Sequence, residues 1–353
     1  MYLTKLTLDN FRSYRSQSFD LDPKINLIIG PNGSGKSNIL ESIYLLASGK
    51  SFRSSSLSKL VNWNSSFSLI RGVLLKNNEN INLEVQLTKD PAKASTLRRF
   101  LIESVPKTRA KYLGVLKTVI FHPEDIRLVT GSPSRRREFL DSIFQTSQWR
   151  YTSALSQYNR ALKHRNELLD QIRLGKNQKS ETFYWDQSLV KNSEIIHQHR
   201  QDFIESVNYF FTTHPNSEIS TISINYYPSI LTPEKLQNNF AHDLDRGYTQ
   251  FGPHRDDFTF DNSVFPSADK NLAFWGSRGQ QRLATLALRL AQIDYFHRTY
   301  SESPILLLDD IFSELDYHHR NLVTKVCQKY QTIFTSSEEG IISILPKAHV
   351  IRL

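Results

Sequence analysis

The chain has 353 residues, a formal net charge of +9 and a single cysteine. One cysteine excludes internal disulfides and a cysteine-rich zinc site, and it fits a protein of the reducing cytoplasm. No apolar run approaches the roughly 18 residues of a membrane span, and the first residues lack a signal-peptide core, so we expect no membrane association. The length suggests about two domains. The positive charge permits a polyanionic partner without identifying one.

The N-terminal strands lead into a glycine-rich loop. Residues 2–8 alternate between apolar and polar side chains and predict a first strand, and Phe19 and Leu21 indicate a second. The uninterrupted apolar run Ile25–Ile29 is typical of a strand that is buried on both faces. Apolar residues at helical spacing follow the loop, and Gly49 is expected to end that helix.

The loop between this strand and this helix fits the P-loop pattern G-x-x-x-x-G-K-[ST]. Its residues are Gly30, Pro31, Asn32, Gly33, Ser34, Gly35, Lys36 and Ser37. Glycines let the backbone approach phosphate oxygens, and the helix N-terminus adds partial positive charge. In such a loop the lysine, Lys36, reaches the β and γ phosphates, and the Ser37 hydroxyl holds Mg²⁺. The alternative is a glycine turn that merely joins a core strand to a core helix.

A hairpin and a basic region follow. Residues 69–75 and 81–87 are the expected arms of the hairpin, and residues 77–80 are its turn. The basic side chains of the next region are Arg98, Arg99, Lys107, Arg109 and Lys111. They either form a solvated face or contact nucleic acid, and the residues alone do not decide between these interpretations. Residues 118–121 then predict another buried strand.

The middle of the chain is rich in helix and predicts an inserted arm or lid. A short helix over residues 135–144 precedes two long helices over residues 151–172 and 183–211. The turn between the long helices makes an antiparallel pair. We therefore expect three parts: residues 1–133 with the P-loop, an inserted helical arm over residues 134–215, and residues 216–353.

Two motifs of the last part bear chemistry. The apolar run that begins at Ile305 ends in Asp309 and Asp310, which is the Walker B pattern of a strand followed by a carboxylate that orders Mg²⁺. Strands of a parallel sheet end at one edge, so these carboxylates are expected near the P-loop. The stretch Ser277-Arg278-Gly279-Gln280 opens a strong helix. Ser277 either caps that helix or belongs to a second anion site, and spacing does not separate the two.

The order of these motifs resembles the ABC-type ATPases of the SMC class, and most closely the RecF family. The resemblance rests on residues 10–14, 49–53, 123–125, 136–141, 252–257, 277–282 and 305–316. It implies an α/β fold in which an ABC-type ATPase head, with a mixed sheet and a flanking antiparallel hairpin, carries an inserted α-helical arm. It also implies ATP and Mg²⁺ as cofactors.

The resemblance assigns roles to individual residues of the nucleotide site. Asp309 is implied to be the Mg²⁺ carboxylate, with Ser37. Asp310 stands where ABC enzymes carry a catalytic glutamate, and its shorter side chain suits slow hydrolysis, with Lys36 completing the catalytic set. Arg12 matches a position near the nucleotide. His122 and Glu124 occupy the Q-loop region, and either Thr335 or Ser336 that of the switch.

By the same resemblance, Ser277, Gly279 and Gln280 form the signature motif, which touches ATP held by a second subunit. Residues 313–316 match the D-loop at the same interface. An ATP-dependent homodimer follows, which opens after hydrolysis.

A RecF-like function then implies binding to single-stranded and gapped double-stranded DNA, with the RecR and RecA pathway proteins as partners. The candidate DNA contacts are Lys50, Arg53, Arg98 and Arg99. The alternative is another ATPase of the SMC/ABC class that acts as a nucleotide-dependent interaction module without a DNA role.

Overall fold

The computed structural model describes residues 1–90, 92, 95–265 and 269–353, and of residues 313, 314 and 317 the backbone alone. The chain forms two compact units, one of Met1–Asp125 with Gln292–Leu353 and one of Ile126–Ala291. The division into three parts at residues 133 and 215 stays a prediction, because compactness does not say which part carries which function.

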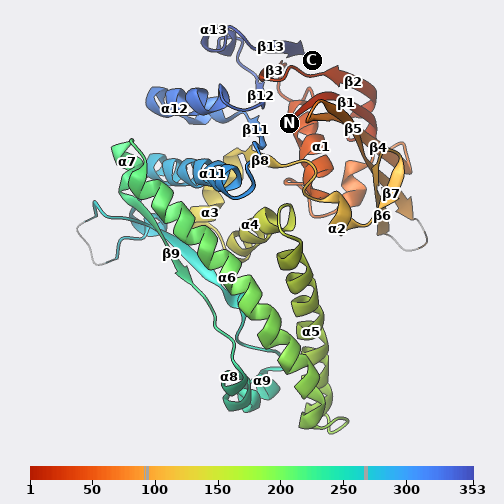
Figure 1. Cartoon of the computed structure of the whole chain (residues 1–353), viewed down its shortest axis with the longest axis vertical. Coiled ribbons are helices and arrows are strands. Elements are labelled where there is room, and N and C mark those ends of the chain that lie inside the picture. Colours follow the sequence, from red (N-terminus) through yellow and green to blue (C-terminus); the bar gives the residue numbers. More distant parts are fainter. Residues whose placement is uncertain (91, 93–94, 266–268) are drawn as a thin grey trace. The chain divides into compact units, whose positions relative to one another are not determined.

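A six-stranded antiparallel sheet forms one side of the first unit, with the strand order β2-β1-β4-β5-β6-β7 (Figure 1). The strands are β1 (Tyr2–Phe11), β2 (Tyr14–Asp20), β4 (Phe67–Lys76), β5 (Glu79–Asp90), β6 (Ser95–Ile102) and β7 (Val105–Lys107). The predicted hairpin is present as β4 and β5. Its turn is tighter than expected, because Asn77 and Asn78 adopt φ values of 52° and 63°, the left-handed region that a two-residue hairpin turn needs. In the predicted basic region, Arg98 and Arg99 lie on strand β6 and Lys107 lies on β7.

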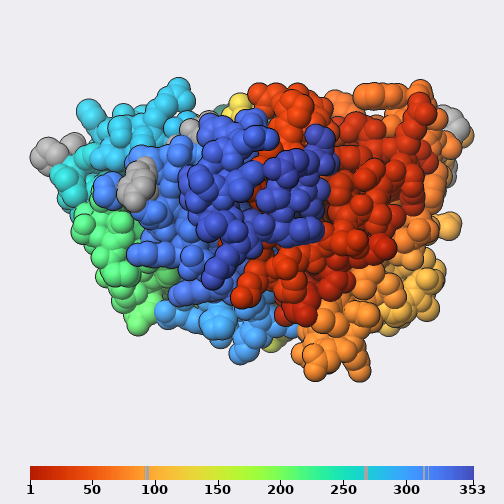
Figure 2. Space-filling view, turned by 90° about the horizontal axis from the view of Figure 1, so that it is seen from above, coloured from red at the N-terminus to blue at the C-terminus, as the bar shows by residue number. Residues whose placement is uncertain are grey.

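A five-stranded parallel sheet carries the P-loop and Walker B strands, in the order β13-β3-β12-β11-β8. The strands are β3 (Ile25–Ile29), β8 (Thr118–Phe121), β11 (Ile305–Asp309), β12 (Thr332–Ser336) and β13 (His349–Arg352). Every residue of β3, β11 and β12 is buried, as the apolar runs predict. The C-terminal strand β13 pairs with β3, and Figure 2 shows C-terminal residues (dark blue) against the N-terminal ones (red) on the same face.

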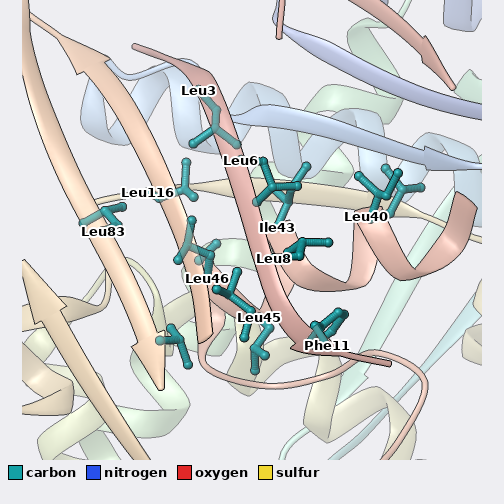
Figure 3. Packing of buried hydrophobic residues seen from close by; sticks show 14 of the residues in the cluster. Leu3, Leu6, Leu8, Phe11, Leu40, Ile43, Leu45, Leu46, Leu83 and Leu116 are labelled. Carbon is teal, nitrogen blue, oxygen red and sulfur yellow. The ribbon is translucent and has the colours of Figure 1, made fainter. Parts of the chain in front are cut away.

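Helix α1 (Lys36–Ser48) packs against strands of both sheets and closes the main hydrophobic core. Figure 3 shows Ile43, Leu45 and Leu46 of this helix among the leucines of β1. Gly49 ends the helix in the left-handed conformation with φ 69°, as predicted. The P-loop is thereby anchored between a buried strand and a buried helix.

The second unit contains the predicted long helices. Helix α4 (Pro133–Gln145) precedes α5 (Trp149–Arg173) and α6 (Phe183–Thr213), and the last two lie side by side as an antiparallel pair (Figure 1). Strands β9 (Ile222–Tyr227) and β10 (Asp257–Asn262) pair antiparallel.

Shorter elements and two further helices complete the chain. They are η1 (Leu57–Leu60), α2 (Arg109–Tyr112), η2 (Pro123–Ile126), α3 (Arg127–Thr130), η3 (Lys179–Thr182), α7 (Ser217–Ser220), α8 (Pro233–Asn238), α9 (Phe240–Arg246), η4 (Pro253–Arg255), α10 (Leu272–Trp275), α11 (Arg278–Tyr300), η5 (Ile311–Glu314), α12 (Tyr317–Cys327) and α13 (Ile341–Ile344). Within the described ranges, no helix combines the length and the apolar character needed to cross a membrane.

Candidate nucleotide-binding site

The P-loop leaves the carboxyl end of β3 and turns into α1 through two left-handed glycines. Gly33 and Gly35 have φ values of 85° and 103°, which residues other than glycine adopt only with strain. A Cβ on Gly35 would also lie 2.9 Å from the Tyr14 hydroxyl. The loop therefore needs glycine at this position both for its backbone path and for the close approach of β2.

The amino group of Lys36 lies over this loop. Its Nζ donates hydrogen bonds to the carbonyl oxygens of Gly30 at 2.7 Å and Pro31 at 2.9 Å, and the residue is 8 % exposed. The positive charge is therefore concentrated where the sequence motif predicts the phosphates.

Backbone donors of the loop add to this field. Gly35 is the N-cap residue of α1 and provides no side-chain acceptor for the first turn. In the part of the chain that the structure describes, the N–H groups of Gly35, Lys36 and Ser37 have no acceptor. Unpaired N–H groups at a helix N-terminus favour an anion, because the helix dipole places about half a positive charge there. This donor set fits the phosphates of a nucleotide.

A serine hydroxyl and a carboxylate meet beside the loop. Ser37 Oγ donates a hydrogen bond to Asp309 Oδ1 at 2.7 Å, so the P-loop and the Walker B strand are brought together as expected. Thr335 Oγ1, on β12, donates to the same oxygen at 2.8 Å. Asp309 is 9 % exposed. Thr335 is one of the two residues proposed for the switch position.

This oxygen pair fits a magnesium ion that also binds phosphate. Among the described residues, no group of three or more His, Cys, Asp or Glu side chains is arranged to hold a metal ion. Mg²⁺ commonly takes one or two protein oxygens and completes its shell with water and substrate phosphates. Ser37 and Asp309 supply oxygens of the type that such a site requires.

Asp310 directly follows the Walker B strand in a strained conformation. Its φ is 50°, and its N–H donates to Thr335 Oγ1 at 3.1 Å. Burial, and then the neighbouring Asp309 carboxylate, raise the pKa of the Asp310 carboxyl above its usual range, while Lys36 opposes this shift. A raised pKa makes the carboxylate a stronger base, which suits a residue that orients and polarises water.

Arg12 is committed to an ion pair that sequence reasoning missed. Its guanidinium donates to both oxygens of Glu41, at 2.9 and 2.7 Å, and Glu41 is fully buried. Ser51 Oγ donates to the same carboxylate at 2.5 Å. In the sequence, Glu41 is an acidic residue on the apolar face of the helix that became α1. This position is the signal from which a buried ion pair could have been predicted.

The signature residues lie in the second unit. Ser277 N donates to Gln280 Oε1 at 2.9 Å, and Gln280 N donates to Ser277 Oγ at 3.3 Å. This reciprocal pair is a capping box at the start of α11, so the predicted cap is present. Ser277 and Gly279 are exposed. The cap does not exclude the other interpretation of Ser277, a second anion site, because an exposed helix N-terminus also suits an anion.

The four candidate DNA contacts differ in their surroundings. Arg98 Nη1 donates to the carbonyl oxygen of Gly49, and its guanidinium lies 5.0 Å from the ring centroid of Phe100. Burial, with Arg109 as a lesser cause, lowers the pKa of Arg98. Arg53 is exposed and donates to Asn38 Oδ1 at 3.0 Å, Arg99 is exposed, and Lys50 is half-buried. Arg98 thus braces the end of α1.

Comparison with known proteins assigns the chain to a family. The family described as RecF/RecN/SMC N terminal domain matches residues 2–349. The DNA replication and repair proteins RecF of Bacillus cytotoxicus and Bacillus thuringiensis are each 34% identical to this chain, over 97% of it and 93% of their own length.

Solved structures agree. A structure described as the recombination mediator protein RecF-ATP in the RecFOR pathway matches with a TM-score of 0.85 and 30% identity, covering 96% of this chain and 92% of that one. The Smc head domain of Pyrococcus furiosus, with an extended coiled coil, matches with a TM-score of 0.53 and 17% identity over 97% of this chain and 91% of its own, which supports the fold alone.

The chain is therefore an ATPase head of the SMC/ABC class, with a helical insertion as predicted. Within that class it belongs to the RecF family.

Proposed function

We propose that this chain binds ATP and Mg²⁺ and uses them to control a DNA-bound homodimer in recombinational repair and replication, in the cytoplasm. The observation that carries the proposal is the hydrogen bond from Ser37 to Asp309, because it joins the P-loop to the Walker B carboxylate. The relative solved with ATP supports the choice of nucleotide. Residues 1–133 and 216–353 would form the head, and residues 134–215 the inserted arm.

The nucleotide site divides its roles among few residues. The loop from Gly30 to Ser37 binds the phosphates, and Lys36 neutralises charge on the β and γ phosphates. Ser37 and Asp309 hold Mg²⁺, which when bound offsets the negative charge that develops on the phosphates. Asp310 orients the attacking water. Because its side chain is shorter than a glutamate, turnover is slow, and hydrolysis works as a conformational switch that DNA stimulates weakly.

The proposed dimer depends on the residues of the signature motif. Ser277, Gly279 and Gln280 of one copy contact the γ-phosphate of ATP held by the other copy, and Arg12 lies near the nucleotide in its own copy. The intact γ-phosphate then contributes free energy to the closed dimer, and its loss shifts the population toward the open form. The exposure of Ser277 and Gly279 is consistent with this role.

DNA binding is the output of the switch. The names of the relatives support a role in DNA replication and repair and in recombination mediation. The closed dimer binds single-stranded DNA and gapped double-stranded DNA junctions, with RecR as a partner, and helps RecA to load. Lys50, Arg53 and Arg99 are the candidate phosphate contacts, and Arg98 contributes less because it braces Gly49.

A filter-binding titration of gapped DNA, with and without ATP and at several salt concentrations, tests the proposal. Affinity should rise with ATP and fall steeply with salt, because phosphate contacts release counterions. DNA affinity that responds to neither ATP nor salt would instead favour the alternative, a nucleotide-dependent interaction module without a DNA role.

A further inference from the structure

Two large aromatic side chains project into solvent immediately before the signature motif. Phe274 is 77 % exposed and Trp275 is 59 % exposed, and both belong to the short helix α10. Single exposed apolar residues are ordinary on protein surfaces. Two consecutive aromatic residues form a larger apolar surface, and aromatic side chains dominate the energetics of protein interfaces.

Helix α10 is fixed firmly to the signature helix. The Asn271 side chain caps α10 by accepting from Ala273 N at 2.9 Å, and Leu272 is fully buried. The side chain of Gln281, on α11, donates to the carbonyl oxygens of Leu272 at 2.9 Å and Gly276 at 3.2 Å, and it is itself 8 % exposed. These hydrogen bonds tie the short helix that carries the aromatic pair to the helix that follows the signature motif.

The connection between the two helices is also short and tight. At Gly276, a Cβ would lie 2.7 Å from the Leu272 carbonyl oxygen, so a larger residue would push α10 away from α11. The Trp275 indole is anchored at its polar end, where Nε1 donates to Asp269 Oδ2 at 3.2 Å. An exposed ring that is held by its polar end presents its apolar face to a partner at a low entropic cost.

We propose that Phe274 and Trp275 form an apolar contact surface for a second copy of this chain in the ATP-closed dimer. The inference rests on the proposed function, in which Ser277 and Gly279 face that second copy. Trp275 precedes Ser277 by two positions, and Gln281 joins the two helices by hydrogen bonds, so the aromatic pair adjoins the motif that the partner covers in the proposed dimer. Arg278, exposed beside them, adds a residue type that is enriched in interface cores together with aromatic residues.

The test compares the double variant Phe274→Ala/Trp275→Ala with Trp149→Ala. Trp149 is a matched control, because it is 72 % exposed at the start of α5 in the same compact unit. Sedimentation velocity with saturating ATP gives the dimer dissociation constant, and ATP affinity is measured separately. We expect the double variant to raise that dissociation constant at least about tenfold with ATP affinity unchanged, and Trp149→Ala to leave both unchanged.

A second measurement keeps the proposal testable if the double variant does not fold. Acrylamide quenching of tryptophan fluorescence is compared in the wild type and in Trp275→Phe, each with and without ATP. Quenching should fall on ATP addition in the wild type by more than in Trp275→Phe, because the interface shields this indole.

The outcomes distinguish the aromatic contact surface from the ATP-dependent dimer itself. ATP-dependent dimers of equal strength in the wild type and the double variant would overturn the aromatic surface and leave the proposed switch intact. Absence of ATP-dependent dimers in the wild type would overturn both. Normal dimerisation combined with lost binding to DNA or to another protein would also overturn the proposal, and would assign the pair to that ligand.

Discussion

Ser37 and Asp309 are 272 positions apart in the sequence, yet Ser37 Oγ donates a hydrogen bond to Asp309 Oδ1 at 2.7 Å. The contact forms because β3 and β11 flank β12 in one parallel sheet, so their carboxyl ends lie at the same edge. Thr335, at the matching position of β12, binds the same carboxylate oxygen. Ser37 at the start of α1, Asp309 at the end of β11 and Thr335 on β12 thus build one oxygen-rich site at the P-loop.

Replacing the serine hydroxyl should separate magnesium binding from phosphate binding. We expect Ser37→Ala to lower ATP affinity in the presence of Mg²⁺ at least about tenfold, since a hydrogen-bonding group next to a charge is lost. Affinity in EDTA should change little, because the loop donors and Lys36 remain. Calorimetric titration of ATP under both conditions measures this. An equal loss under both conditions would contradict a metal role for Ser37.

Removing the P-loop ammonium should abolish tight nucleotide binding altogether. In Lys36→Ala the proposed phosphate site loses its ammonium group, and the Gly30 and Pro31 carbonyl oxygens lose the donor that holds the loop. Fluorescent ATP titration measures the affinity. Lys24→Ala, an exposed lysine just before β3, is the control and should bind normally. Unchanged affinity in Lys36→Ala would remove the assignment of the loop.

Local patterns in the sequence predict the strands and loops of this site, because each depends on neighbouring residues. The apolar runs before Gly30 and before Asp309 are each sufficient to predict a buried strand. The spacing of the glycines and of Lys36 after β3 predicts a P-loop. Strand β13 escaped prediction because His349–Arg352 is short and is defined mainly by its pairing with β3. Strand β6 is also not predicted, because its two adjacent arginines indicate a charged region and not an alternating strand.

The Arg12–Glu41 pair shows a different limit. The resemblance implies a position near the nucleotide for Arg12, but the sequence does not reveal that the guanidinium pairs with a buried carboxylate on α1. Such a pairing depends on how the turn after β1 lies over the helix. Long-range polar partners of this kind require the three-dimensional arrangement, whereas the P-loop is recognised from eight consecutive residues.

Breaking the Arg12–Glu41 pair should destabilise the first unit. Glu41→Ala leaves the Arg12 guanidinium and the Ser51 hydroxyl without their shared acceptor, and removing one partner of a buried ion pair commonly costs about 3 kcal/mol or more. Thermal unfolding followed by circular dichroism measures the loss. Glu84→Ala is the control, because that carboxylate pairs more loosely, at 3.8 Å, with the exposed Arg71. Equal melting temperatures for the two variants would show that Glu41 contributes little.

His254 should make the stability of the second unit sensitive to mild acid. Tyr158 donates its hydroxyl to His254 Nδ1 at 2.7 Å, and Nε2 donates to the Thr249 carbonyl oxygen at 3.0 Å, an arrangement that satisfies both nitrogens of the neutral ring. Burial lowers the pKa of His254 to about 4; Arg255 and Arg137 add to the shift, while the hydrogen bond to the Thr249 carbonyl oxygen and the Asp256 carboxylate oppose it. The folded state therefore resists a proton that the unfolded chain accepts below its ordinary pKa of 6.5.

The lowered pKa of His254 makes the folded state less stable in acid. Between the unfolded and folded pKa values the unfolded chain binds more protons, so stability is full above pH 6.5, falls as the pH drops toward 4, and levels off below that. We expect a loss of about 2 kcal/mol between pH 7 and pH 5 from this group. Urea unfolding of the wild type and of His254→Gln at both pH values measures it. The variant keeps an amide at this position but does not titrate, so its pH dependence should be flatter; parallel curves would show that His254 is already exposed to protons in the folded protein.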